Sequence, residues 1–176
     1  MDVKKDLIAI IEEHLEVAKN AQIEGFDTLK EYLDNSDRIF ISAAGRSFLQ
    51  MKGFAMRLMH IDYDVVIVGE VTTPSIKEND LLIVGSGSGE TFGILTQLRK
   101  AKKIGAKTFV ITQSPNSSMA KEADGAIILP KINSIQHGGS QIEQFLGLTL
   151  DAFIMGMMNE RGLDVSHILI NHANLE

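Results

Sequence analysis

Apolar residues in the middle of the chain form two alternating patterns, short continuous runs and segments with helical periodicity. Five short runs are almost entirely apolar, at residues 38–43, 64–68, 81–84, 107–112 and 126–129. Each run has the length of a buried strand, whereas most segments between them repeat apolar positions at helical spacing. Apolar strands that alternate with helices are typical of a parallel sheet covered on both faces. The pattern predicts an α/β fold, a doubly wound five-stranded parallel sheet in the flavodoxin-like order.

Helical periodicity also flanks this alternation. Residues 3–23 and 26–33 precede the first strand, and the two helices predicted there must pack on the sheet or on another subunit. A longer helix is predicted from about 141 to 160, and a short helix within the tail at 165–176.

The helix at 141–160 is apolar around most of its circumference, which indicates burial on more than one side. Its apolar set includes Phe145, Leu146, Leu148, Leu150, Phe153, Ile154, Met157 and Met158. A chain of 176 residues has room for one well-filled core, so we expect part of this helix at a subunit interface. We expect one domain, with N-terminal helices in 1–36, the sheet core in 37–130, and a loop, interface helix and tail in 131–176.

Charge and composition narrow the classes of partner. A net charge of -6 leaves no basic surplus for neutralising many phosphates, which argues against nucleic acid or an anionic membrane. The chain has no cysteine, so disulfides and a thiolate nucleophile are excluded. The charged N-terminus and the absence of an apolar run of about 20 residues predict a cytoplasmic protein without signal peptide or membrane span.

The stretch 85–91 is the most informative part of the chain. A buried-strand pattern ends there in alternating glycine and serine, and a helix pattern follows. Glycines allow a close backbone approach, and exposed N–H groups at a helix start attract an anion, most simply a phosphate. The residues proposed for this cradle are Ser86, Gly87, Ser88, Gly89, Glu90 and Thr91.

Two common nucleotide sites fit this stretch poorly. No Gly-Lys-Ser/Thr follows the glycines, so a nucleoside triphosphate is disfavoured. A dinucleotide fingerprint would place a glycine where Glu90 stands and an acidic residue about 20 positions later, yet none occurs before Glu122. The simpler alternative is an ordinary turn in which Ser88 caps the helix.

A second polar turn, Gly45-Arg46-Ser47, follows the first strand. In this type of sheet the first and third strands are neighbours, and ligands bind at their carboxyl ends. The two turns could therefore meet on one phosphosugar, although Ser47 could also simply cap its helix and Arg46 be solvated.

Glu143 stands at the start of the long C-terminal helix and has two interpretations. Ser140-x-x-Glu143 matches a capping box, and the spacing alone favours this structural role. A carboxylate near a helix start and a flexible loop could instead act as a general base, kept ionised by the helix dipole.

Four histidines, His60, His137, His167 and His172, are candidate metal ligands. Only His167 and His172 lie at a plausible spacing, and no third ligand is near them in the sequence. We therefore expect no metal.

With these residues assembled, the chain resembles the sugar isomerase (SIS) domains, and among them the 6-phospho-3-hexuloisomerases, over nearly its whole length. The matching segments are 44–47, 54–60, Gly69-Glu70 with Thr73-Pro74, 85–91 and the terminal 172–176.

The resemblance implies an activity and roles for these residues. The family interconverts 3-hexulose 6-phosphate and fructose 6-phosphate without a metal or other cofactor, in homotetramers with active sites at subunit contacts. By this resemblance, Ser47 and the segment 86–91 hold the sugar phosphate and Glu143 accepts the proton. Arg46, His60 and His172 are candidate donors to the charged oxygen, His172 from a neighbouring subunit. A place in the ribulose monophosphate pathway is also implied.

Two departures from the family pattern lie beside the expected pocket. The family usually has Met-Gly and a phenylalanine before the glutamate, where this chain has Gly138-Gly139 and Ile142, and a glycine where this chain has Phe48. An isomerase of a different phosphosugar is therefore one alternative. A module that binds a sugar phosphate without turnover is the other.

Overall fold

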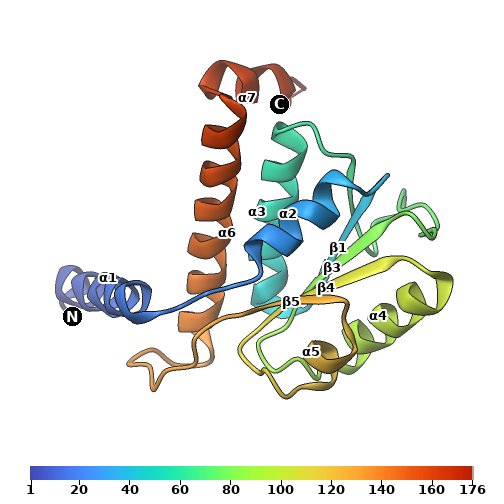
Figure 1. Ribbon diagram of the computed structural model, residues 1–176. Coiled ribbons are helices and arrows are strands. Elements are labelled where there is room, and N and C mark those ends of the chain that lie inside the picture. Colours follow the sequence, from blue (N-terminus) through green and yellow to red (C-terminus); the bar gives the residue numbers. More distant parts are fainter. Residues whose placement is uncertain (176) are drawn as a thin grey trace.

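The computed structural model describes residues 1–175, in which the chain forms five strands and seven helices (Figure 1). The strands are β1 Ile39–Ala43, β2 Val65–Ile67, β3 Leu81–Gly85, β4 Lys107–Thr112 and β5 Gly125–Ile128. The helices are α1 Val3–Asn20, α2 Phe26–Asp34, α3 Gly45–His60, α4 Phe92–Ile104, α5 Ser118–Glu122, α6 Ser140–Arg161 and α7 Val165–Asn171. None of these helices, within residues 1–175, is long and apolar enough to cross a membrane.

All five strands are parallel and lie in the order β2-β1-β3-β4-β5. This confirms the predicted doubly wound sheet in the flavodoxin-like order. β1 and β3 pair along their whole length, so that Ala43 at the end of β1 lies opposite Gly85 at the end of β3. The two polar turns that follow these strands therefore leave the sheet side by side.

The alternation of side chains along each strand divides the core in two. In β1, Ile39 and Ile41 join a core formed with α2, α3 and α6, whereas Phe40 joins a core formed with α4 and α5. Figure 1 shows the corresponding layers, with α4 and α5 on one side of the sheet and α2, α3 and α6 on the other. Burial on both faces explains why the strands are uninterrupted apolar runs.

Two helix ends differ from the sequence prediction by three residues. α1 stops at Asn20 because Ala21 adopts an extended backbone, three residues before the predicted end. α3 begins at Gly45, directly after extended Ala44, so Arg46 and Ser47 lie within its first turn rather than in a preceding loop. Their side chains consequently project from a helix start at the edge of the sheet.

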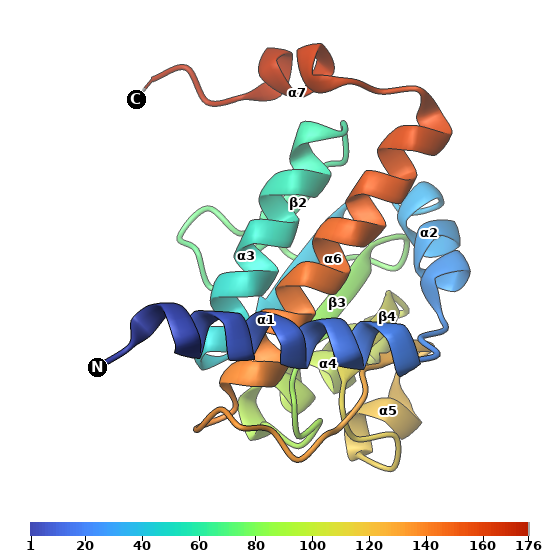
Figure 2. The same cartoon turned by 90° about the vertical axis from the view of Figure 1, so that its left-hand side faces the viewer.

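α1 is the least buried of the long helices. Only His14 and Val17 are buried, although Leu7, Ile11 and Leu15 are apolar and exposed. Figure 2 shows α1 crossing the N-terminal half of α6. An apolar groove of about 560 Å³ lies between the two helices, with Phe145 and Leu148 in its wall.

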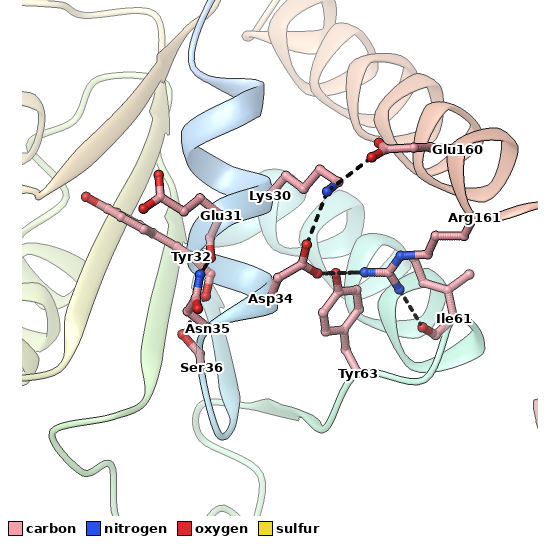
Figure 3. A network of polar contacts seen from close by, with 10 residues as sticks. All are labelled: Lys30, Glu31, Tyr32, Asp34, Asn35, Ser36, Ile61, Tyr63, Glu160 and Arg161. Carbon is pink, nitrogen blue, oxygen red and sulfur yellow. Dashed lines mark hydrogen bonds and ion pairs between the residues drawn. The ribbon is translucent and has the colours of Figure 1, made fainter.

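A polar network joins the ends of α2 and α6 to the chain before β2 (Figure 3). Asp34 accepts hydrogen bonds from the Tyr63 hydroxyl and from Arg161 Nη2 at 2.7 Å, and pairs with Lys30 at 3.2 Å. Arg161 also donates to the Ile61 carbonyl oxygen at 3.3 Å. Burial acts to raise the pKa of Asp34, but the Tyr63 hydrogen bond and the two cations lower it below its ordinary value.

Replacing Asp34 with asparagine tests this network. We expect the Asp34→Asn variant to lose about 1–2 kcal/mol of unfolding free energy, because two cations lose their shared carboxylate at a partly exposed site. Urea denaturation measures the change. The Glu31→Gln variant is the matched control, since it removes the same charge from the exposed face of the same helix. Equal stability of the two variants would show that the network contributes nothing.

Candidate active site

The candidate site lies at the carboxyl edge of the sheet, where α3 and α4 begin beside each other. The register of β1 and β3 brings the first turn of α3, with Arg46 and Ser47, next to the turn at 86–91. This is the arrangement that the sequence predicted for the two polar turns.

The turn at 86–91 is shaped by its own hydroxyl groups. Ser86 Oγ accepts a hydrogen bond from the Gly89 N–H at 3.1 Å and lies 3.0 Å from Thr91 Oγ1. Thr91, not Ser88, is the N-cap of α4, and its side chain makes no capping hydrogen bond. The suggestion that Ser88 caps the helix is therefore wrong, and the first turn of α4 leaves N–H groups for an anion.

Hydrogen bonds from the end of β4 and the residues after it also hold the turn at 86–91. The Gly87 carbonyl oxygen accepts hydrogen bonds from the Thr112 hydroxyl (3.2 Å), the Gln113 N–H (3.3 Å) and the Ser114 hydroxyl (3.3 Å). With its carbonyl held by the β4 end, Gly87 keeps one orientation. The turn is thus preorganised before any ligand binds.

Gly89 shows why this turn needs glycine. Its φ of +64° is in the left-handed region, and a Cβ there would lie 2.1 Å from Ser117 Oγ. Ser117 caps α5 by accepting a hydrogen bond from the Ala120 N–H. Contact between the cradle and α5 therefore leaves no space for a side chain.

Glu90 is directed to α5 rather than into the cradle. Its carboxylate accepts a hydrogen bond from the Ser118 N–H at 2.6 Å. This bond lowers the pKa of Glu90, with a further contribution from Lys121. Its own N–H donates to Ser88 Oγ at 3.2 Å. Glu90 thus supports the turn from outside, and the structure does not bring its side chain toward an anion in the cradle.

Glu143 does not form the capping box that its spacing favoured. α6 begins at Ser140, its N-cap is Gly139, and no side chain caps it. The Glu143 carboxylate instead pairs with Arg46, with Oε2 3.1 Å from Nε, and Arg46 Nη1 donates to Ser140 Oγ at 2.8 Å. Ser140, which the sequence assigned to the cap, thus acts as a second anchor for Arg46.

The carboxylate of Glu143 is held but not saturated. Its side chain is 13% exposed, and Oε2 is buried without a hydrogen-bond partner among residues 1–175. The 3.1 Å contact with Arg46 is therefore a charge pairing with poor hydrogen-bond direction. Oε2 thus has a charge partner but no directed hydrogen bond, and the carboxylate as a whole keeps capacity to accept a proton.

Ile142, the residue before Glu143, lies beside the turn at 86–91. A Cβ placed on Gly87 would lie 3.9 Å from Ile142 Cγ2. The start of α6 thus packs directly against the turn at 86–91. The departure from the family pattern at Ile142 falls at the contact between the two halves of the site.

Ser47 and Phe48 lie on the same first turn of α3. Ser47 is partly buried and does not cap the helix, because the N-cap is Ala44. Phe48 packs against the core, and Lys52 Nζ lies 4.9 Å from its ring centre. The structure therefore places Ser47 near the candidate site and gives Phe48 a packing role.

His60 and His172 lie together at the opposite edge of the sheet. α3 leaves the carboxyl edge at Gly45 and ends at His60 after 16 residues, a length of about 24 Å. The His60 ring stacks on His172 with centroids 5.5 Å apart. Within one chain neither histidine reaches Glu143, so a role in this site stays a prediction that requires another subunit.

Comparisons with known proteins identify the family. The SIS domain family matches residues 32–143, which run from the end of α2 to Glu143. A Bacillus subtilis 3-hexulose-6-phosphate isomerase is 42% identical over 87% of this chain and 88% of its own. The chain belongs to the 3-hexulose-6-phosphate isomerase family. A Methylomonas aminofaciens family member with the same name is 40% identical over 89% of this chain and 91% of its own.

A solved structure supports the same assignment. A Methanococcus jannaschii protein, described with an inferred function as 3-hexulose-6-phosphate isomerase, superposes with a TM-score of 0.85. It is 33% identical and the match covers 98% of this chain and 99% of the other. The similarity to this family member therefore covers the sheet, the candidate site and α6.

An alanine at Gly89 tests the cradle. We expect the Gly89→Ala variant to lose about 2–5 kcal/mol of unfolding free energy, from the left-handed backbone and the clash with Ser117. Gly53→Ala in α3 is the matched control, because a Cβ there meets open space and should stabilise by up to about 1 kcal/mol. Urea denaturation compares them, and a neutral Gly89→Ala would contradict the described packing.

The buried His60 predicts a pH dependence of stability. Burial lowers the pKa of His60, with Arg57 and His172 adding to the shift. Unfolded chains therefore take up the proton first, and stability falls as the pH drops below about 6.5. We expect the His60→Gln variant to lose stability less steeply between pH 7 and pH 5. The exposed His137→Gln variant should keep the wild-type slope, and equal slopes in both variants would refute the assignment.

Proposed function

We propose that this chain interconverts 3-hexulose 6-phosphate and fructose 6-phosphate. The relatives described above are named 3-hexulose-6-phosphate isomerase, which supports this proposal. The observation that carries the proposal is the buried, incompletely bonded carboxylate of Glu143 beside a preorganised anion cradle. The proposed reaction uses no cofactor.

The cradle would hold the phosphate. The first N–H groups of α4, the hydroxyls of Ser86 and Thr91, and the close backbone approach that Gly87 allows suit a phosphate group. Ser47 would add a hydroxyl from the neighbouring helix start. A fixed phosphate positions the sugar chain relative to the base. Such orientation can lower the activation barrier by several kcal/mol.

Glu143 would move the proton between the two carbons. The carboxylate takes the proton from C2 of the 3-hexulose phosphate, and the electron pair forms a C2–C3 double bond while the C3 carbonyl oxygen becomes an enediolate. Glu143 returns this proton to C3, and the C2 hydroxyl proton passes to the C3 oxygen, which leaves the carbonyl at C2 and a hydroxyl group at C3. One carboxylate on one face of the sugar suffices for both transfers.

Arg46 is the donor best placed to stabilise the enediolate. Its guanidinium has five N–H groups, of which the structure uses those toward Ser140 and Glu143, and its side chain is 56% exposed. A half-exposed cation beside the base can meet developing negative charge on the sugar oxygen.

We further propose a homotetramer in which α1 and α6 take part in the subunit contacts. Exposed apolar side chains on the two helices, including Leu7, Ile11 and Leu15 on α1 and Leu148 and Met155 on α6, support this proposal. An apolar surface of this kind favours association. A contribution of His60 or His172 to a neighbour's site, the ribulose monophosphate pathway and a cytoplasmic location remain predictions.

Glu143→Gln tests the base assignment. We expect kcat for 3-hexulose 6-phosphate to fall by about 10²–10⁴, because a neutral amide cannot accept the proton. Fructose 6-phosphate should still raise the melting temperature, since the cradle is intact. Asp151→Asn, an exposed position on the same helix, is the matched control and should keep wild-type kcat.

The same assays separate the alternatives. Wild-type turnover of another phosphosugar but not of 3-hexulose 6-phosphate would select a different isomerase. A melting shift without turnover of any phosphosugar would select a binding module. Near wild-type turnover by the Glu143→Gln variant would remove Glu143 from the mechanism.

A further inference from the structure

Two adjacent residues of α1 contact the chain on both sides of Glu143. Glu13 binds the loop before α6, and His14 binds the residue after Glu143. These contacts join positions more than 120 residues apart in the sequence. They are unexpected on a helix that buries only His14 and Val17.

The Glu13 carboxylate gathers three hydrogen bonds from one short stretch of loop. Oε1 accepts from the Ile135 N–H at 2.7 Å, and Oε2 accepts from the Ser134 hydroxyl at 3.0 Å and from Gln136 Nε2 at 2.9 Å. The Gln136 N–H also donates to Ser134 Oγ at 2.9 Å, which closes the loop on itself. Partial burial acts to raise the pKa of Glu13, but these hydrogen bonds outweigh it and lower the pKa below its ordinary value.

His14 secures the other side of Glu143. His14 Nε2 lies 2.8 Å from Gln144 Oε1, and the imidazole ring stacks on Phe145 with centroids 6.0 Å apart. Gln144 directly follows Glu143 on α6. The segment 137–143, which contains the two left-handed glycines 138 and 139, is therefore held at both ends by α1.

This segment needs an external anchor. Gly138 and Gly139 have φ values of +65° and +83°, and α6 starts without a side-chain cap. A glycine pair that precedes an uncapped helix end has many accessible conformations. Without a fixed loop, the first turn of α6 would present Glu143 in variable positions.

We propose that Glu13 is a positioning residue, whose carboxylate holds the loop at 134–136 and thereby sets the position of the Glu143 carboxylate for proton transfer. This inference rests on the proposed function of Glu143. Glu13 itself touches no reacting atom and acts only through the loop and the start of α6.

The first test measures the loop without using turnover. In the Glu13→Gln variant, hydrogen exchange at the amides of residues 134–136 should become about tenfold faster, the loss expected for one charge-assisted hydrogen bond. Glu12→Gln is the matched control, because it removes the same charge from the neighbouring, exposed position of α1. Unchanged exchange in Glu13→Gln would overturn the clamp, whether or not Glu143 is the base.

The second test asks whether the loop positions the base. We expect kcat of Glu13→Gln to fall by about 10- to 100-fold, as for a small misplacement of a reacting group, with KM and competitive inhibition by inorganic phosphate near wild-type values. The Glu12→Gln variant should match wild type in all three. Faster exchange with unchanged kcat would overturn the positioning role, and so would a change confined to KM.

A double-mutant comparison separates this inference from the proposed function. If Glu13 acts only through Glu143, then adding Glu13→Gln to Glu143→Gln should change the residual kcat by no more than about twofold. A further large fall would show that Glu13 acts by another route. If Glu143→Gln alone keeps full activity, the proposed function of Glu143 fails, while the exchange result still decides whether the clamp exists. Should Glu13→Gln fold poorly by circular dichroism, Glu13→Asp provides the same tests, since it keeps the charge but shortens the reach.

Discussion

The parallel pairing of β1 with β3 is the constraint on which the candidate site depends. Because their registers match from Ile39 and Leu81 onward, both strands end at the same level of the sheet. Each then leads directly into a helix, so two helix starts with their free N–H groups lie beside each other. A parallel sheet builds such an edge without a special sequence, and the residues after the strands decide what it binds. Here those residues are glycines and hydroxyls on one side and Arg46 with Ser47 on the other.

The sheet edge alone offers a candidate anion site but no candidate base. Glu143 reaches the edge on α6, which follows the last strand and returns against α3 on the same side of the sheet (Figure 1). Two contacts unite the elements: the ion pair between Glu143 and Arg46, and the packing of Ile142 beside Gly87. The ion pair balances the charge of Glu143, and the packing of Ile142 sets the distance between α6 and the turn at 86–91. The proposed base is thus tied to both helix starts by residues that lie some 50 to 100 positions away in the chain.

Much of this architecture follows from local sequence patterns. The apolar runs predicted all five strands. The expected flavodoxin-like order makes β1 and β3 neighbours, and this order predicted the meeting of the two polar turns. Features set by tertiary contacts were not. Ser140-x-x-Glu143 has the spacing of a capping box, but the competing cation of Arg46, which comes from a distant helix, takes the carboxylate. His60 was predicted to be a donor in the site because an imidazole can stabilise a charged oxygen. The length of α3 places it instead at the opposite edge of the sheet. The partners of Glu13 lie more than 120 residues away, and no local pattern marks them.

The start of α6 explains why such distant contacts are needed. A base must be held to within a fraction of an ångström of its proton, yet the two left-handed glycines and the uncapped helix end give this segment little stiffness of its own. The capping box that the spacing offers would stiffen it, but that box would engage Glu143 itself together with Ser140. A carboxylate engaged with its own helix end would lose the lone pair that accepts the proton. The chain instead anchors the segment from outside, through Arg46 at Ser140 and through Glu13 and His14 on either side. In this arrangement Oε2 of Glu143 pairs with Arg46 but has no directed hydrogen bond.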